Sequence, residues 1–91
     1  SYALYANFPN PFNPITQIRF DLPVMTNADL VIYNMLGQKV KTFNIPNASA
    51  GNHLITWNAT NELGAPVSAG VYLYQLQTEG FVKTKKMILL K

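Results

Sequence analysis

Alternating apolar and polar side chains predict a series of short β-strands along this chain. In the segment from residue 15 to residue 22, Ile18 and Phe20 point one way and Arg19 and Asp21 the other, as expected of a half-buried strand. Further strands are expected over residues 1–6 (a short edge strand), 28–33, 39–45 and 52–58, with the inward sets Ala28, Leu30, Ile32 and His53, Ile55, Trp57. No segment shows a sustained helical period.

The longest runs of apolar and β-branched residues lie at the end of the chain and predict a β-hairpin. Residues 70–78 and 81–91 flank a turn at residues 79–80, and a glycine between two such runs is typical of a hairpin. We expect Gly80 to adopt a positive φ, because glycine does so without steric cost. The residues expected to share the buried face of this hairpin are Tyr72, Tyr74 and Leu76.

Two of the segments between the predicted strands have a distinctive composition. Residues 7–14 contain three prolines, which fix φ, remove backbone donors and disfavour regular structure in the residues before them. We expect both phenylalanines of this segment, Phe8 and Phe12, to pack against the strands. A turn is also predicted at residues 61–64, where Asn61 begins it and Gly64 supplies a left-handed position.

Together these elements predict an all-β fold, an antiparallel immunoglobulin-like β-sandwich of about seven strands. Trp57 is expected to face Tyr72 across the two sheets, and Tyr72 is placed to make a tyrosine-corner-like hydrogen bond. A chain of 91 residues forms one domain. We divide residues 1–91 into an entry segment, residues 1–14, and a sandwich body, residues 15–91.

Composition narrows the functional classes. Charged residues make up 12% of the chain, and cysteine is absent, which excludes disulfides and thiolate metal sites. A basic stripe can bind nucleic acid or a membrane surface. Lysines on an edge strand more often prevent edge-to-edge pairing, and we favour that interpretation for Lys83, Lys85, Lys86 and Lys91, which supply most of the net charge of +3. No run of about 20 apolar residues predicts a membrane helix. No signal peptide begins the sequence, and we expect Ser1 to follow a cut within a longer protein.

Candidate catalytic and metal-binding residues are few. The acids are isolated in sequence, and Asp21 and Asp29 with the nearby Asn27 offer only a thin candidate for a Ca²⁺ site. The single histidine, His53, lies on a predicted inward face, so we interpret it as a hydrogen-bonded structural residue. No nucleophile elbow or phosphate-binding glycine loop is present. We therefore expect no enzymatic activity and no cofactor.

Six blocks of this sequence, in order and at similar spacing, resemble the C-terminal (type A) sorting domain of type IX secretion cargo proteins of Bacteroidota. The blocks are NFPNPFNP at residues 7–14, TQIRFDLP at 16–23, YNMLGQKV at 33–40, AGNH at 50–53 followed by Trp57, SAGVYLY at 68–74 and KKMILLK at 85–91. The resemblance covers the full length. It departs after Trp57, where the family often carries acidic residues and this chain has NATN at residues 58–61.

The resemblance implies a non-catalytic signal that directs an upstream cargo protein across the outer membrane. The implied partners are the outer-membrane type IX machinery and a sortase-like peptidase that removes the domain and anchors the cargo. The cargo would pass through the periplasm to the cell surface or the medium. Neither nucleic acid binding nor membrane insertion is implied, and a homodimer through a sheet edge is possible. Recognition is assigned to the terminal residues, Lys86, Met87, Ile88, Leu89, Leu90 and Lys91. The motif loops contain Asn10, Pro11, Phe12, Asn13, Pro14, Gly37, Gly70 and Tyr72.

Two other functions stay open on the sequence alone. The first is an immunoglobulin-like accessory module that binds carbohydrate or acts as a spacer, with aromatic rings at Tyr2, Tyr5, Tyr33 and Tyr74 as its platform. The second is a structural sandwich of the kind found in flagellar hook-capping proteins. The fold by itself cannot choose among these functions. A terminal strand with a free edge could also accept a partner strand by β-augmentation.

Overall fold

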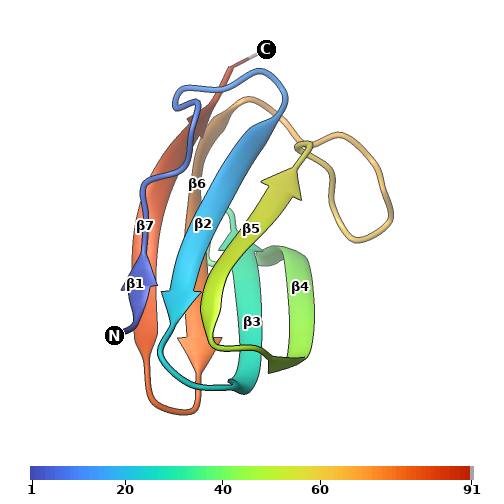
Figure 1. Cartoon of the computed structure of the whole chain (residues 1–91). Helices are drawn as coiled ribbons and strands as arrows, with labels where there is room; N and C mark the ends of the chain where they lie inside the picture. The colour runs from blue at the N-terminus through green and yellow to red at the C-terminus, as the bar shows by residue number, and fades with distance from the viewer. Residues whose placement is uncertain (91) are drawn as a thin grey trace.

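The computed structural model describes residues 1–90, which form two antiparallel sheets packed face to face (Figure 1). One sheet has the order β1-β2-β5, built from Ala3–Leu4, Thr16–Leu22 and Gly51–Trp57. The other has the order β4-β3-β6-β7, built from Lys39–Ala48, Thr26–Tyr33, Gly70–Thr78 and Val82–Leu89. These seven strands confirm the predicted all-β sandwich. Lys91, the last predicted signal residue, lies outside the described residues.

The predicted inward faces form the core between the two sheets. Ile18 and Phe20 of β2 and Tyr74 of β6 have no exposed surface, and each such burial of a large apolar side chain contributes about 1.5–3 kcal/mol. The rings of Trp57 and Tyr72 meet edge to face with centroids 5.5 Å apart, as predicted. The Tyr72 hydroxyl donates to the Ser68 carbonyl at 2.6 Å, which confirms the tyrosine-corner-like bond.

His53 is a structural residue, as its place in the strand pattern predicts. Its ring stacks on Phe20 with centroids 5.1 Å apart. Because a carbonyl oxygen can only accept, His53 Nε2 carries a hydrogen and donates to the Ser49 carbonyl at 2.7 Å. Within residues 1–90, no helix is long and apolar enough to cross a membrane.

The hairpin of β6 and β7 forms as predicted, but the conformation expected for its glycine is wrong. Positive φ angles occur at four other glycines, and Gly80 is not among them. A Cβ atom at Gly80 would lie 3.1 Å from the Tyr2 hydroxyl, so the missing side chain makes room for this tyrosine. The Tyr2 ring in turn stacks on Phe81 with centroids 4.9 Å apart. Glycine fits position 80 because a distant residue, Tyr2, lies close to it, and the turn does not require a positive φ there.

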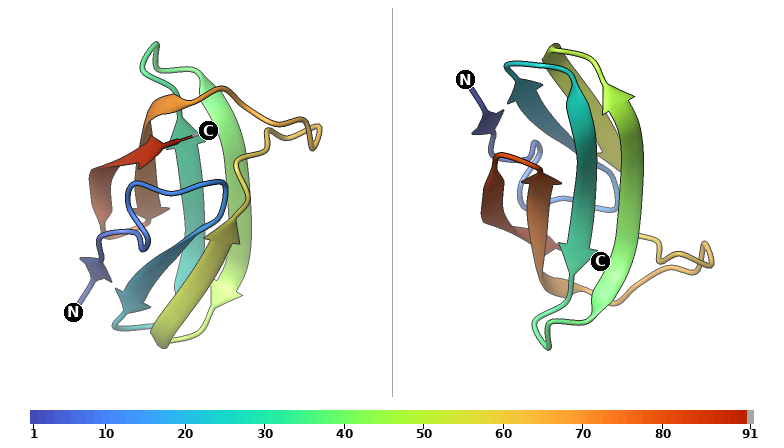
Figure 2. Two further views of the ribbon diagram at one scale, coloured as in Figure 1. Left: turned by 90° about the horizontal axis from the view of Figure 1, so that it is seen from above. Right: turned by 90° about the horizontal axis from the view of Figure 1, so that it is seen from below.

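The connection between β1 and β2 crosses one end of the sandwich, whereas the connection between β5 and β6 projects away from it (Figure 2). In the first connection, the prediction that both phenylalanines pack against the strands is half wrong. Phe12 is 2% exposed, but Phe8 is 77% exposed. Phe8 is held by its backbone, which exchanges two hydrogen bonds with Gln17. Its ring is left in solvent.

Candidate functional site

The predicted signal residues at the end of the chain divide between the two faces of β7. The side chains of Met87 and Leu89 are 0% and 1% exposed and belong to the core. Successive strand residues point to opposite faces, so the alternate residues reach solvent. Of the described signal residues, those that a partner can contact are Lys86, Ile88 and Leu90. The buried pair therefore serves the fold, and the exposed set is available for recognition.

The end of β7 is joined to the Asn-Pro-rich connection by main-chain hydrogen bonds. The Phe12 N–H donates to the Ile88 carbonyl at 3.0 Å, and the Leu90 N–H donates to the Phe12 carbonyl at 2.8 Å. The Asn10 side-chain oxygen accepts from the Ile88 N–H at 3.0 Å, across 78 positions of sequence. We call this set of residues, Asn10, Phe12, Ile88 and Leu90, the terminal junction. It unites the first and last sequence blocks in one structural unit, at the upper end of the molecule in Figure 1.

The buried Phe12 side chain anchors the junction to the core. Its ring lies 5.9 Å from that of Trp57, between centroids, so the junction rests on the centre of the core. The peptide bonds before Pro9, Pro11 and Pro14 are cis. The other motif residues of the loop, Asn10, Pro11, Asn13 and Pro14, are exposed.

A buried polar network fixes the base of this loop. The Tyr74 hydroxyl donates to the Tyr5 carbonyl at 2.8 Å and accepts from the Asn7 N–H at 2.9 Å. The Asn7 amide donates to the Thr16 hydroxyl at 3.0 Å, and that hydroxyl donates to the Pro9 carbonyl at 2.8 Å. Buried polar groups need such partners, since an unpaired group costs about 1–3 kcal/mol. The network ties the loop to both sheets.

Burial raises the pKa of the Tyr74 hydroxyl above 10.0, partly offset by the hydrogen bond from the Asn7 backbone. The signal for this site was present in the alternation that places Tyr74 on the inward face, because a buried tyrosine hydroxyl usually finds a partner. The same burial removes Tyr74 from any aromatic surface for sugars, since the residue is 0% exposed. Tyr2 is also engaged, by its stacking on Phe81.

Two of the three remaining motif residues lie on β6 beside β7, and the third lies elsewhere. Gly70 pairs with Leu89 and Tyr72 pairs with Met87 in the β6–β7 ladder. Gly37 lies apart in the β3–β4 turn, where it adopts a φ of +81° and nothing would meet a Cβ atom. Glycine is needed there for the backbone angle alone. Gly70 and Tyr72 thus lie beside β7, and Gly37 does not.

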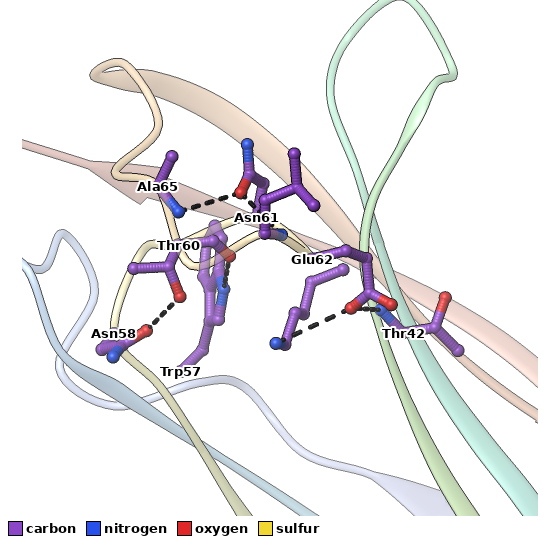
Figure 3. Close-up of polar contacts among 9 residues, drawn as sticks. Thr42, Trp57, Asn58, Thr60, Asn61, Glu62 and Ala65 are labelled. Carbon is purple, nitrogen blue, oxygen red and sulfur yellow. Dashed lines mark hydrogen bonds and ion pairs between the residues drawn. The ribbon is translucent and has the colours of Figure 1, made fainter.

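The connection between β5 and β6 holds its shape mainly by its own polar contacts (Figure 3). The Asn61 side-chain oxygen accepts from the Leu63 and Ala65 N–H groups, both at 3.0 Å. Gly64 has a φ of +82°, which confirms the predicted Asn-to-Gly turn. Glu62 reaches β4, where it accepts from the Thr42 N–H at 3.2 Å and lies 3.6 Å from the Lys41 ammonium.

The predicted thin Ca²⁺ candidate is not assembled. Asp29 accepts from the Asn44 amide at 2.8 Å, the Asn27 oxygen accepts from the Asn47 N–H at 2.9 Å, and Asp21 accepts from the Tyr5 hydroxyl. Within residues 1–90, no three His, Asp or Glu side chains gather closely enough to hold a metal ion. The same residues enclose no pocket.

Sequence comparison identifies one matching family. A profile of the secretion system C-terminal sorting domain matches residues 6–90. A comparison with curated proteins found no match.

Solved structures show the same fold. Dimeric latent PorU from Porphyromonas gingivalis is 24% identical with a TM-score of 0.79, covering 96% of this chain and 9% of PorU. PorZ of the type IX secretion system of the same organism is 18% identical with a TM-score of 0.67, covering 98% of this chain and 12% of PorZ. The hook-capping protein FlgD from Xanthomonas campestris is 17% identical with a TM-score of 0.66, covering 96% of this chain and 64% of FlgD. The chain therefore spans only part of each of these proteins.

Proposed function

The chain belongs to the family of secretion system C-terminal sorting domains, and from this premise we propose that it directs an upstream cargo protein across the outer membrane by type IX secretion. The observation that carries the proposal is the family match over residues 6–90. On this proposal the domain is a non-catalytic signal. Its immediate partner is the outer-membrane secretion machinery.

The terminal junction supports this role, because it presents the end of the signal strand in one fixed form. Ile88 and Leu90 are 38% and 51% exposed although both are apolar. Their backbones are held by Asn10 and Phe12, so their side chains are displayed on an ordered surface. A partner that binds a preorganised surface pays little conformational entropy. We assign recognition to Ile88 and Leu90 with the neighbouring Lys86.

The later steps follow from the same proposal. The cargo precedes Ser1, enters the periplasm and is delivered to the cell surface or the medium. A sortase-like peptidase removes the domain and couples the cargo to the surface. These steps require that the folded domain be recognised as a unit, because the signal residues and the Asn-Pro loop meet only in the folded chain.

A reporter fusion tests the proposal. Residues 1–91 are fused behind a signal peptide and a fluorescent protein in a bacterium with a working type IX system. We expect the reporter at the surface or in the medium. The double variant Ile88→Ser/Leu90→Ser should leave the reporter in the periplasm, because it changes the exposed side chains assigned to recognition. The domain should stay folded, because Met87 and Leu89 remain in the core.

The matched control is Leu54→Ser, which alters an apolar side chain that is 57% exposed on β5, in the other sheet. This variant should be secreted normally. Circular dichroism and thermal unfolding must first show that all variants are folded. Retention of the wild-type fusion in the periplasm would refute sorting, and normal secretion of the Ile88/Leu90 variant would refute the assigned surface.

The carbohydrate-binding alternative gains no support from the aromatic residues. Tyr74 is buried, Tyr2 stacks on Phe81, and Tyr5 donates to Asp21 beneath the Arg19 guanidinium, which lies 4.8 Å from its ring centroid. These three of the four suggested rings are engaged in separate contacts, and the hydroxyl of the fourth, Tyr33, accepts from the Gln77 amide at 3.2 Å.

A further inference from the structure

The outer edge of β7 consists of two parts with different hydrogen bonding. At the end of the strand, the N–H and C=O groups of Ile88 and the N–H of Leu90 point away from β6 and are bonded to Asn10 and Phe12. Backbone groups of alternate strand residues point to the same side. The same edge therefore carries the N–H and C=O groups of Val82, Thr84 and Lys86. Among residues 1–90, no hydrogen bond reaches these groups.

This open segment, Val82, Thr84 and Lys86, has a defined beginning and end. β7 is the last strand of its sheet, and β1 runs near it but pairs with β2 in the other sheet (Figure 1). The stacked rings of Tyr2 and Phe81 lie at the hairpin end, and the terminal junction closes the other end. The segment itself reaches solvent, with Val82 61% exposed and Thr84 and Lys86 exposed. It has room for one short strand in a limited set of registers.

The lysines of β7 determine which kind of strand can pair with the open segment. Lys83 and Lys85 share one face of β7, and Lys86 lies on the other. A second copy of the chain, paired antiparallel about Thr84, would place Lys83 opposite Lys85 of the other copy, twice. Like charges directly opposite one another destabilise a strand pair, and opposite charges stabilise it. The edge is thus unsuited to self-pairing and suited to an acidic strand.

We propose that the open segment of β7 binds an extended partner strand carrying two acidic side chains two residues apart. Main-chain hydrogen bonds to Val82, Thr84 and Lys86 would supply much of the affinity, and the acids facing Lys83 and Lys85 would supply the selectivity. This inference rests on the proposed sorting function, in which the strand belongs to the secretion machinery. The terminal junction would set the register by blocking extension past Lys86.

A synthetic peptide probes the edge directly. The probe is acetyl-Thr-Val-Glu-Val-Glu-Val-Thr-amide, in which the central valine can face Thr84 and the two glutamates can face Lys83 and Lys85. Titrated into the ¹⁵N-labelled domain at millimolar concentration, it should shift the amide signals of Val82, Thr84 and Lys86 and slow their hydrogen exchange. The same peptide with lysine in place of both glutamates should bind about tenfold more weakly, or undetectably.

Two variants of one residue separate backbone pairing from surface charge. Thr84→Pro removes the outward N–H, and proline is tolerated on a free edge because that N–H bonds no neighbouring strand. Thr84→Ala keeps the N–H. Both variants lose the hydrogen bond from the Gln75 amide to the threonine hydroxyl, so they differ only in the backbone N–H and the proline ring. We expect Thr84→Pro to abolish probe binding and Thr84→Ala to retain it.

Three results would overturn the inference. They are no amide shifts in the folded wild-type domain, equal binding by Thr84→Pro and Thr84→Ala, and concentration-dependent self-association through the Val82–Lys86 amides. The reporter fusion keeps this inference distinct from the sorting function. If the wild-type and Thr84→Pro fusions are both secreted, sorting stands and the edge is not required. If the wild-type fusion is retained, sorting itself fails.

Discussion

The two long connections of this domain are irregular for different reasons. The β1–β2 connection is bonded to strands far away in sequence, through the Tyr74 hydroxyl at one end and β7 at the other. The β5–β6 connection projects from the sandwich and is held chiefly by Asn61 and by a contact of Glu62 with β4 (Figure 3). In the first, only Asn7 and Phe12 are buried and the rest of residues 5–15 are exposed, so it is held by bonds to distant strands. The other combines its own turn bonds with bonds of Glu62 to β4 and of the Thr60 carbonyl to the Trp57 indole.

The difference teaches where stability and function depend on loop sequence. In the first connection, we expect a change to be transmitted to β7, because Phe12 and Asn10 hold the backbone of Ile88. In the second, we expect a change to act mainly on the turn itself. The family departure at residues 58–61 falls in this second connection, which contributes none of the hydrogen bonds of the terminal junction.

The largest expected effect is that of Phe12→Ala. The side chain is 2% exposed and packs against Trp57, so its removal should destabilise the domain by about 3–5 kcal/mol. Phe8→Ala is the matched control in the same loop, since Phe8 is 77% exposed, and should cost less than about 0.5 kcal/mol. Urea unfolding followed by tryptophan fluorescence measures both. Similar losses for the two variants would contradict the contrast.

A smaller effect is expected for Tyr74→Phe, which removes the hydroxyl. The Tyr5 carbonyl and the Asn7 N–H then lose their hydrogen-bond partner. The expected loss is about 1–3 kcal/mol at neutral pH. The variant also has a pH signature. Since the pKa of Tyr74 is raised in the folded state, the unfolded chain releases this proton first, near pH 10.0. Tyr74 therefore contributes stability below that pH that is lost as the pH rises towards its folded pKa.

The free energy of unfolding should consequently fall less steeply above pH 10 in Tyr74→Phe than in the wild type. Tyr5, whose pKa is raised chiefly by its hydrogen bond to Asp21, remains in both proteins and cancels in the comparison. Urea unfolding at neutral and alkaline pH tests this. Parallel pH profiles would argue against a buried, protonated Tyr74.

The smallest effect belongs to the projecting connection. Asn61→Ala removes the acceptor for two turn N–H groups and should cost about 0.5–1.5 kcal/mol. Asn58→Ala, which loses one contact with the Thr60 hydroxyl, should cost less. In both variants the amide signals of Ile88 and Leu90 should stay in place. A shift of those signals would show that this connection is coupled to the terminal junction after all.

Strand patterns in the sequence predicted the sandwich, the inward faces and the meeting of Trp57 with Tyr72, because these follow from local periodicity. Local turn chemistry likewise predicted the Asn61–Gly64 turn. The errors concern contacts between distant segments. Gly80 is explained by Tyr2, and the solvent-exposed Phe8 by backbone pairing with Gln17. Neither partner can be identified from residues near the position concerned.

The candidate site shows the same limit. Its residues were predicted by resemblance to a family, and the alternation of β7 further implies that Met87 and Leu89 face inward. That Asn10 and Phe12 occupy the edge of β7 was not predicted, because no periodicity links positions 78 residues apart. The terminal junction also changes the expectation of a free terminal edge. It occupies backbone groups of Ile88 and Leu90, so only the part of the β7 edge before them is open.

The terminal junction has a further consequence, for the rates of folding and unfolding. Contacts between residues far apart in sequence must overcome the entropy of closing a long loop, so they form late, after the sheets have brought the chain ends together. Interactions that are absent from the transition state slow unfolding without speeding folding. We therefore expect the bonds of Asn10 and Phe12 to β7 to lengthen the lifetime of the folded domain. These bonds would stabilise the folded domain kinetically.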